Sequence, residues 1–200
     1  MKRWLGLALA LAMLAGGAAA EVDQGRLTQA LDCTVQLEAN GVDTVIRPNN
    51  QPYIGTMEAE DCELIAYVDF VEMPNEGGTF VRLTLALMTP ESLGASRMTL
   101  SVGGKAWAFD VSPATSEYDC VYYEDYAVCL SDESLPLLKA LGRRDEAVQV
   151  TLEAEERALA GSIALPRADM ADLYDRFVDA GGLKQPYDAL RERWPVTQTK

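Results

Sequence analysis

The stretch from Tyr118 to Cys129 constrains the fold most, because it places two cysteines close together around a run of tyrosines and acids. If the chain reverses direction at Glu124 and Asp125, Cys120 lies opposite Cys129 at a non-hydrogen-bonded pair, where Cα atoms approach to about 4.5 Å. That separation suits a disulfide. We therefore predict a hairpin closed by a Cys120–Cys129 bond. Glu-Asp is not a preferred dipeptide for a tight turn, so a longer turn or a shifted register stays open.

The pairing of the two remaining cysteines follows from the Cys120–Cys129 bond. An exported chain with four cysteines is expected to form two disulfides, and four cysteines allow three connectivities. If Cys120 pairs with Cys129, elimination leaves Cys33 with Cys62. Neither pair has the C-x-x-C spacing of a redox motif or a zinc ribbon. We therefore predict two structural disulfides.

The N-terminus has the pattern of a signal peptide. Lys2 and Arg3 precede an apolar segment from Trp4 to Leu14, and three alanines at 18–20 offer a cleavage site before Glu21. The alternative, a membrane anchor, needs roughly 20 apolar residues, and this segment is shorter. We therefore predict that residues 1–20 are removed, that no transmembrane segment remains, and that the protein is periplasmic or secreted.

The charge balance limits the possible partners. Without Lys2 and Arg3 the chain carries 15 basic and 31 acidic residues, a net charge near −16. Nucleic acids need a basic footprint, so a nucleic-acid partner is not expected. A cationic protein partner fits this charge. The alternative is that the acidity only keeps an exported protein soluble.

Apolar alternation predicts most of the secondary structure, because alternate side chains of a strand point to opposite faces. Turn-rich segments at 74–78 and 103–104 join the clearest strand pairs. Apolar spacing of three and four predicts helices instead. The predicted strands are 33–37, 44–46, 62–71, 79–87, 98–102, 105–111, 147–152 and 159–165, and the predicted helices are 131–141, 170–178 and 186–194.

These elements predict a single domain over residues 21–195, followed by a frayed tail at 196–200. The closely spaced strands indicate a mainly β, α+β fold: an antiparallel β-sandwich or barrel-like body with two or three short helices in its C-terminal half.

Several landmarks follow one another along the chain in a distinctive order. They are Cys33-Thr34-Val35, Cys62-Glu63-Leu64-Ile65, the strand from Leu83 to Pro90, Cys120 with Cys129, the segment from Leu135 to Leu141, Ile163-Ala164-Leu165, and Asp172-Leu173-Tyr174-Asp175. This order resembles the invasion-associated locus B family of exported bacterial proteins. The resemblance implies a β-rich periplasmic or secreted protein linked to host-cell interaction in some pathogens, and it implies no catalytic residues.

The absence of histidine excludes several kinds of chemistry. Ser-His-Asp triads, Cys-His dyads and HExxH zinc sites all need this residue, and no glycine-rich phosphate-binding motif occurs. We therefore predict no enzyme activity, no catalytic residues, no metal site and no cofactor. A carboxylate-only hydrolase and calcium coordination remain open alternatives. Their candidate residues are Glu58, Glu60, Asp61, Glu63, Glu117, Asp119, Glu124 and Asp125.

The predicted binding site is the tyrosine group of the same hairpin. Exposed tyrosines offer large, rigid contact area with a polar tip, although strand alternation should send some of them into the core. We expect a non-enzymatic binding or accessory protein of the bacterial envelope; the alternative is an envelope structural or inhibitor-like module that binds a basic protein. The candidate binding residues are Tyr118, Tyr122, Tyr123, Glu124, Asp125 and Tyr126.

Overall fold

The computed structural model describes residues 21–29 and 31–200, so the predicted signal peptide lies outside the described residues. All strand pairs in this part are antiparallel, and four α-helices accompany them. The expected β-rich α+β fold is confirmed. The strands are β1 (Cys33–Leu37), β2 (Thr44–Pro48), β3 (Tyr53–Met57), β4 (Glu63–Met73), β5 (Gly78–Thr89), β6 (Arg97–Val102), β7 (Lys105–Asp110), β8 (Ala114–Tyr118), β9 (Val121–Cys129), β10 (Val148–Glu153), β11 (Ala158–Ile163) and β12 (Val196–Thr199). The helices are α1 (Gln24–Thr28), α2 (Leu135–Leu141), α3 (Arg167–Asp179) and α4 (Asp188–Arg193), with 3-10 turns η1 (Pro74–Glu76) and η2 (Gly182–Lys184).

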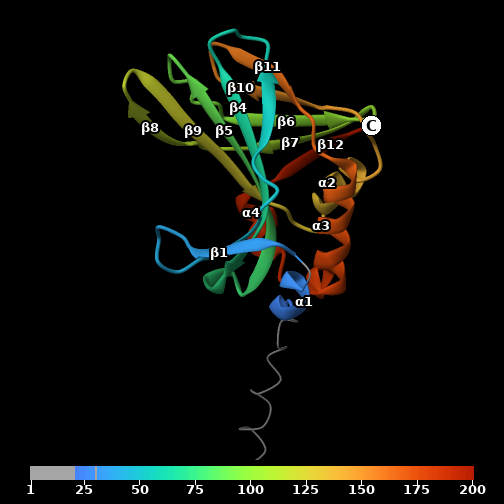
Figure 1. Ribbon diagram of the computed structural model, residues 1–200. Coiled ribbons are helices and arrows are strands. Elements are labelled where there is room, and N and C mark those ends of the chain that lie inside the picture. The colour runs from blue at the N-terminus through green and yellow to red at the C-terminus, as the bar shows by residue number, and fades with distance from the viewer. Residues whose placement is uncertain (1–20, 30) are drawn as a thin grey trace, which may run out of the picture.

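The strands form one twelve-stranded sheet that turns a corner at β3. Its order is β12-β7-β6-β10-β11-β3-β4-β5-β9-β8, and β1 joins through β2 to β4. Strand β3 pairs with β4 on one side and with β11 on the other. The strands beyond this corner, including β6 and β7, run across the direction of β4 and β5 (Figure 1). Strands β8, β12 and β1 each pair with one neighbour and are therefore edges of the sheet.

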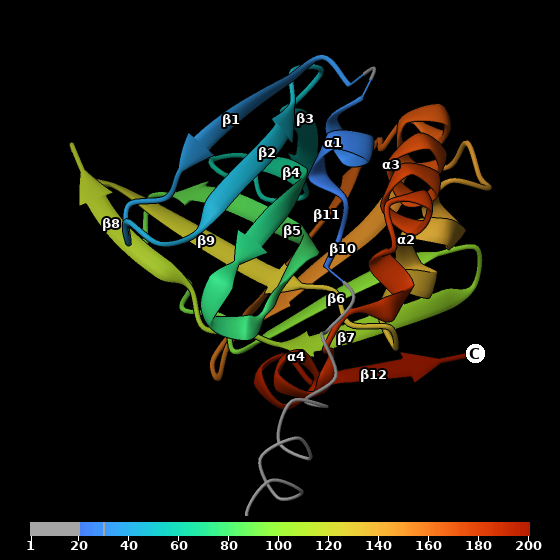
Figure 2. The same ribbon diagram turned by 90° about the horizontal axis from the view of Figure 1, so that it is seen from below.

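The β4–β5 hairpin carries the centre of the core. Leu83, Leu85 and Leu87 alternate onto one face of β5 and are buried, as predicted. On the same face, Phe70 of β4 stacks on Phe177 of α3 with ring centroids 6.0 Å apart. Helices α2 and α3 lie together on one side of the molecule, and β1 and β8 lie on the opposite side (Figure 2). The helices thus cover the inner face of the sheet and leave the β8 edge free of helix.

The sequence of helix α2 contains the local signals from which a helix was predicted. Pro136 occupies its first turn, where a missing N–H costs nothing, and the leucine stripe is buried. The helix ends at Gly142, where a Cβ would lie 2.8 Å from the backbone nitrogen of Ala171 in α3. Only glycine allows this approach. The helix begins at Leu135, close to Pro136 as expected, but the cap differs from the predicted Ser131 or Asp132: Ser131 and Ser134 form a turn, and Ser134 is the N-cap residue.

The predicted disulfides are wrong, since no cysteine pair in the described residues lies at bonding distance and all four cysteines are free. Cys120 lies in the β8–β9 turn, whereas Cys129 ends β9. Nine strand residues at about 3.4 Å each separate the two by roughly 25 Å or more. The Cys33–Cys62 pairing rested on this bond and fails with it. Cys33 begins β1 and Cys62 precedes β4.

Three further elements differ from the prediction. Residues 196–199, where we predicted a frayed tail, pair with β7 as β12. Strands β3 and β8 were missed. None of the helices described in residues 21–29 and 31–200 is long and apolar enough to cross a membrane.

Candidate functional site

The β8–β9 hairpin turns at Asp119 and Cys120, so the predicted turn at Glu124–Asp125 is wrong. Tyr118 pairs with Val121 across the true turn, and the two turn residues have φ values of 55° and 65°. Positive φ at both central positions is the backbone of a type I′ turn, which matches the twist of a hairpin. Aspartate tolerates this conformation. The predicted pairing of Cys120 with Cys129 across the hairpin therefore does not occur.

Strand alternation then divides the predicted tyrosine group between two faces of β9. Tyr126 and Glu124 point inward, and both residues are fully buried. The Tyr126 hydroxyl donates to Glu124 Oε2 at 2.6 Å and accepts from the backbone N–H of Ala95 at 3.1 Å. Glu124 also accepts from Ser92 Oγ at 2.6 Å and from the Gly94 N–H at 3.0 Å. Glu124 and Tyr126 thus hold the loop that precedes β6 against β9. Neither side chain is available to bind a partner.

The pKa of Glu124 follows from these contacts. Burial alone would raise it, but hydrogen bonds from Ser92, Tyr126 and the backbone amides of Gly94 and Leu93 outweigh burial and lower the pKa below its usual value. Burial raises the pKa of Tyr126, and its hydrogen bond to Glu124 raises it further. The carboxylate therefore stays ionised inside the core.

Tyr118, Tyr123 and Asp125 point to the other face of the hairpin, which we call the outer face. The strand register continues this face across the sheet: Tyr123 lies opposite Met88, and Asp125 lies opposite Ala86. All members of the outer face are exposed or half-buried, whereas their inward-pointing neighbours on β4 and β5 are buried. The outer face includes Ile54, Glu63, Ile65, Tyr67, Thr84, Ala86, Met88, Tyr118, Tyr123 and Asp125.

The outer face exposes large apolar and aromatic side chains. Tyr118 is 75 % exposed, Ile54 68 % and Tyr123 38 %. Tyr122, which we grouped with them, lies on the opposite side of β9 against Glu117. The negative charge of Glu117 and its hydrogen bond raise the pKa of Tyr122. The predicted site thus keeps three residues, Tyr118, Tyr123 and Asp125, and loses the other three.

A buried ion network lies at one end of the outer face. Asp69 is completely buried between two arginines, Arg47 at 2.6 Å and Arg82 at 3.0 Å. Arg82 also reaches Glu38 at 2.7 Å, and the Arg47 guanidinium lies 4.2 Å from the ring centroid of Tyr67. The network joins β2, β4 and β5 to the residue after β1, and all its charges are compensated.

Asp125 has no such compensation. Among the described residues, no basic group lies within 4.0 Å of it. Although Asp125 is exposed at the surface, loss of surrounding water raises its pKa, and the more distant Arg82 and Arg47 lower it in part. The outer face therefore presents two carboxylates, those of Asp125 and Glu63, that have no ion-pair partner among the described residues and lie among apolar and aromatic side chains.

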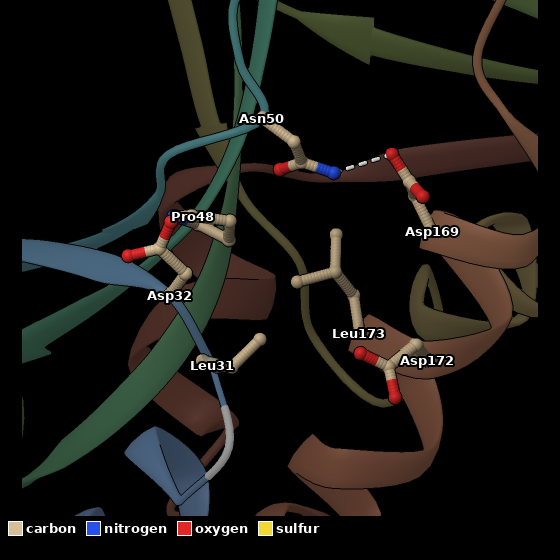
Figure 3. A pocket seen from close by; sticks show the side chains of 7 residues that line it. All are labelled: Leu31, Asp32, Pro48, Asn50, Asp169, Asp172 and Leu173. Atoms are coloured by element: carbon tan, nitrogen blue, oxygen red, sulfur yellow. Dashed lines mark hydrogen bonds between the residues drawn. The ribbon is translucent and has the colours of Figure 1, made fainter.

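A second candidate site is an acidic pocket of about 240 Å³ beside α3 (Figure 3). Its aspartates come from distant parts of the chain, so sequence spacing could not reveal it. Leu31, Pro48 and Leu173 form its apolar wall, and Asp32, Asn50, Asp169 and Asp172 form its polar lining.

Each aspartate of this pocket already has a donor. Asp169 accepts from Asn50 at 2.5 Å and from the Tyr53 hydroxyl at 3.2 Å. Asp172 accepts from Arg176 at 2.6 Å, and Asp32 accepts from Asn49. Burial and the charge of Asp169 raise the pKa of Tyr53, so this phenol remains a donor. No cluster of three metal-binding side chains occurs in the described part of the chain.

The acidic clusters suggested for hydrolysis do not form a shared site. Glu58, Glu60, Asp61 and Glu63 lie exposed around the β3–β4 connection. In the second cluster, Glu124 and Asp125 point to opposite faces of β9.

No family model, curated protein or solved structure matches this chain. Its function is therefore inferred from its own residues and their geometry.

Proposed function

We propose that the protein is an exported, non-enzymatic binding or accessory protein of the bacterial envelope that recognises a protein partner through the outer face. The observation that carries this proposal is the exposure of Tyr118, Tyr123 and Ile54 on one face of the sheet. Tyrosines at such positions anchor interfaces because they bury large area at a low entropic cost. The bent sheet, taken as a sandwich-like scaffold, holds them on paired strands rather than on a loop.

The chemistry of this face favours a basic partner. Asp125 offers an unpaired carboxylate within the apolar surface, and Asp119 lies in the turn next to Tyr118. The chain as a whole has a net charge of −14, which accelerates encounter with a cationic protein. Nucleic acid is disfavoured for the same reason.

The resemblance to the invasion-associated locus B family supports an exported location and a link to host-cell interaction. The alternative within the same class is an envelope structural or inhibitor-like module that binds a basic protein. Both proposals use the same face; they differ in whether the partner belongs to the host or to the bacterium.

A carboxylate-dependent hydrolase is the weaker proposal. Such an enzyme needs two carboxylates facing each other across a bound substrate. In the acidic pocket, Asp169 and Asp172 are already engaged by Asn50, Tyr53 and Arg176, which leaves them poorly placed for proton transfer.

Titration with lysozyme as a model basic protein tests the binding proposal. We expect saturable, salt-sensitive binding to residues 21–200, because exposed charges attract less at high ionic strength. Tyr118→Ser combined with Tyr123→Ser should weaken it at least about tenfold, since a combined loss of about 1.4 kcal/mol is a factor of ten and interface tyrosines are often hot spots. The matched control is Val42→Ser, which removes an exposed apolar side chain from the β1–β2 connection. Equal binding by the double variant and the wild type would contradict the proposed surface.

A further inference from the structure

Most cations of this acidic protein are paired, and the exceptions gather in one place. Of the 15 lysines and arginines in residues 21–200, ten arginines lie within 4.0 Å of a carboxylate. In the described part of the chain, five cations have no such partner. Three of these five, Lys105, Lys139 and Arg143, line a single cavity.

This cationic cavity has a volume of about 360 Å³ and lies where α2, α3, η2 and the start of β7 meet. Lys105 comes from β7, Lys139 from α2, and Arg143 from the residues that follow α2. The one acid in its lining, Asp132, is held by Arg191, whose Nε and Nη2 donate to its two oxygens at 3.0 and 2.6 Å. The three cations therefore line the cavity without an ion-pair partner of their own among the described residues.

The rest of the cavity wall is apolar. Leu135 and Pro136 of α2 contribute one side, and Tyr174 of α3 contributes an aromatic surface. Leu183 of η2, which is 53 % exposed, lines the same cavity. The Lys139 ammonium lies 5.6 Å from the centroid of the Tyr174 ring, so charge and aromatic surface are adjacent.

We propose that the cationic cavity binds a small organic anion, a carboxylate or phosphate ester that also carries an aromatic or aliphatic group. Three cations can form charge-assisted hydrogen bonds to an oxyanion, and the guanidinium of Arg143 can bind it with two parallel hydrogen bonds. The aliphatic and tyrosine wall contacts the remainder of the ligand, as in most small-molecule sites. Lys105, Lys139 and Arg143 are surface-exposed at the cavity, so ligand can enter without rearrangement of the fold. This site is separate from the outer face and does not depend on it.

Isothermal titration calorimetry with phenyl phosphate tests this site, with inorganic phosphate and neutral benzyl alcohol as comparison probes. We expect one saturable site for phenyl phosphate, weaker binding of inorganic phosphate, and no binding of benzyl alcohol. Lys139→Gln combined with Arg143→Gln should lower the affinity for phenyl phosphate by about a hundredfold, roughly tenfold for each charge-assisted contact removed.

The matched control is Arg26→Gln combined with Arg97→Gln. These two exposed arginines belong to ion pairs outside the cavity, so the control changes the net charge equally and should leave the affinity within about twofold. An equal loss in both double variants would overturn the site, because it would show an effect of net charge alone. Absence of saturable phenyl phosphate binding would also overturn it. Equal affinity for inorganic phosphate and phenyl phosphate would overturn the apolar half of the proposal.

Discussion

At the scale of single residues, the protein separates its buried acids from its available ones. Glu124 and Asp125 are neighbours in sequence, yet Glu124 is buried with four donors and Asp125 is exposed without an ion-pair partner. Strand alternation alone produces this division. When acids follow one another on a strand, those at one set of alternate positions are buried and stabilise the fold. Those at the other set remain exposed at the surface.

Glu124→Gln should destabilise the protein by about 2–3 kcal/mol at pH 7, because the amide group cannot accept all the donors that the carboxylate accepts. The folded pKa of Glu124 is lowered, so its stabilisation is present above the unfolded pKa of about 4.3 and is lost as pH falls through the folded pKa. Urea unfolding from pH 7 downward should thus show a steeper loss for wild type than for the variant. Glu63→Gln, at an exposed acid, should change stability by less than about 0.5 kcal/mol.

The four thiols provide a second test at this scale. Cys120 is exposed and should react with iodoacetamide in the folded protein, whereas burial raises the pKa of Cys129 to about 12 and should protect it. After unfolding without reductant, mass spectrometry should find all four cysteines alkylated. A peptide pair linked by a disulfide would contradict the free thiols described above.

At the scale of elements, apolar alternation predicted the hairpins that build the core. It did not predict the strands whose sequences lack this alternation. The pairs β4–β5, β6–β7 and β10–β11 were all predicted, because alternate residues face a common core. Strand β8 was missed because its five residues are all exposed, so no apolar residue repeats along it. The turn at Asp119–Cys120 was missed for a related reason: cysteine is not a usual turn residue, and the disulfide hypothesis placed the turn elsewhere.

Cys120→Gly tests the position of this turn. Cys120 has a φ of 65°, which costs an L-residue about 1 kcal/mol and glycine almost nothing. The variant should gain about that much stability and about 2–4 °C in Tm, measured by calorimetry. A disulfide at this position would give the opposite result, a loss of about 2–4 kcal/mol. Gly103→Ala should lower Tm instead, because Gly103 has a φ of 59° and an added Cβ would collide with the side chain of Arg144.

The buried ion network holds neighbouring strands together. Asp69→Asn should cost about 3–5 kcal/mol, because it removes the counter-charge from two arginines that are largely buried. Glu153→Gln, which breaks the exposed pair with Arg97 at 3.9 Å, should cost less than about 1 kcal/mol. Chemical denaturation of both variants gives the comparison. Equal small effects would show that the network contributes little.

At the scale of the whole molecule, local patterns gave the fold class but not the order of strands or the sites. The corner at β3 and the pairing of β12 with β7 depend on contacts between segments far apart in sequence. The same holds for the acidic pocket and the cationic cavity, whose lining residues come from separated elements. The sequence named Tyr118 and Tyr123 only as part of a larger tyrosine group, and the true turn and strand register were needed to separate them from the buried Tyr126.

The arrangement leaves the molecule with two chemically different surfaces. The outer face combines aromatic residues with unpaired acids, and the cationic cavity lies beside α2 and α3, the helices on the side opposite β8 (Figure 2). One surface suits a basic protein and the other a small organic anion. Binding at one surface therefore does not require the other.

Hydrogen exchange measured with and without bound lysozyme tests the central claim most directly, because it shows where on the fold a basic protein binds. The predicted result is slower exchange in β8 and β9 and in the neighbouring part of β5, with residues 167–173 and 135–143 unchanged. Protection confined to the acidic pocket or to α2, with β8 and β9 exchanging as in the free protein, would contradict recognition through the outer face.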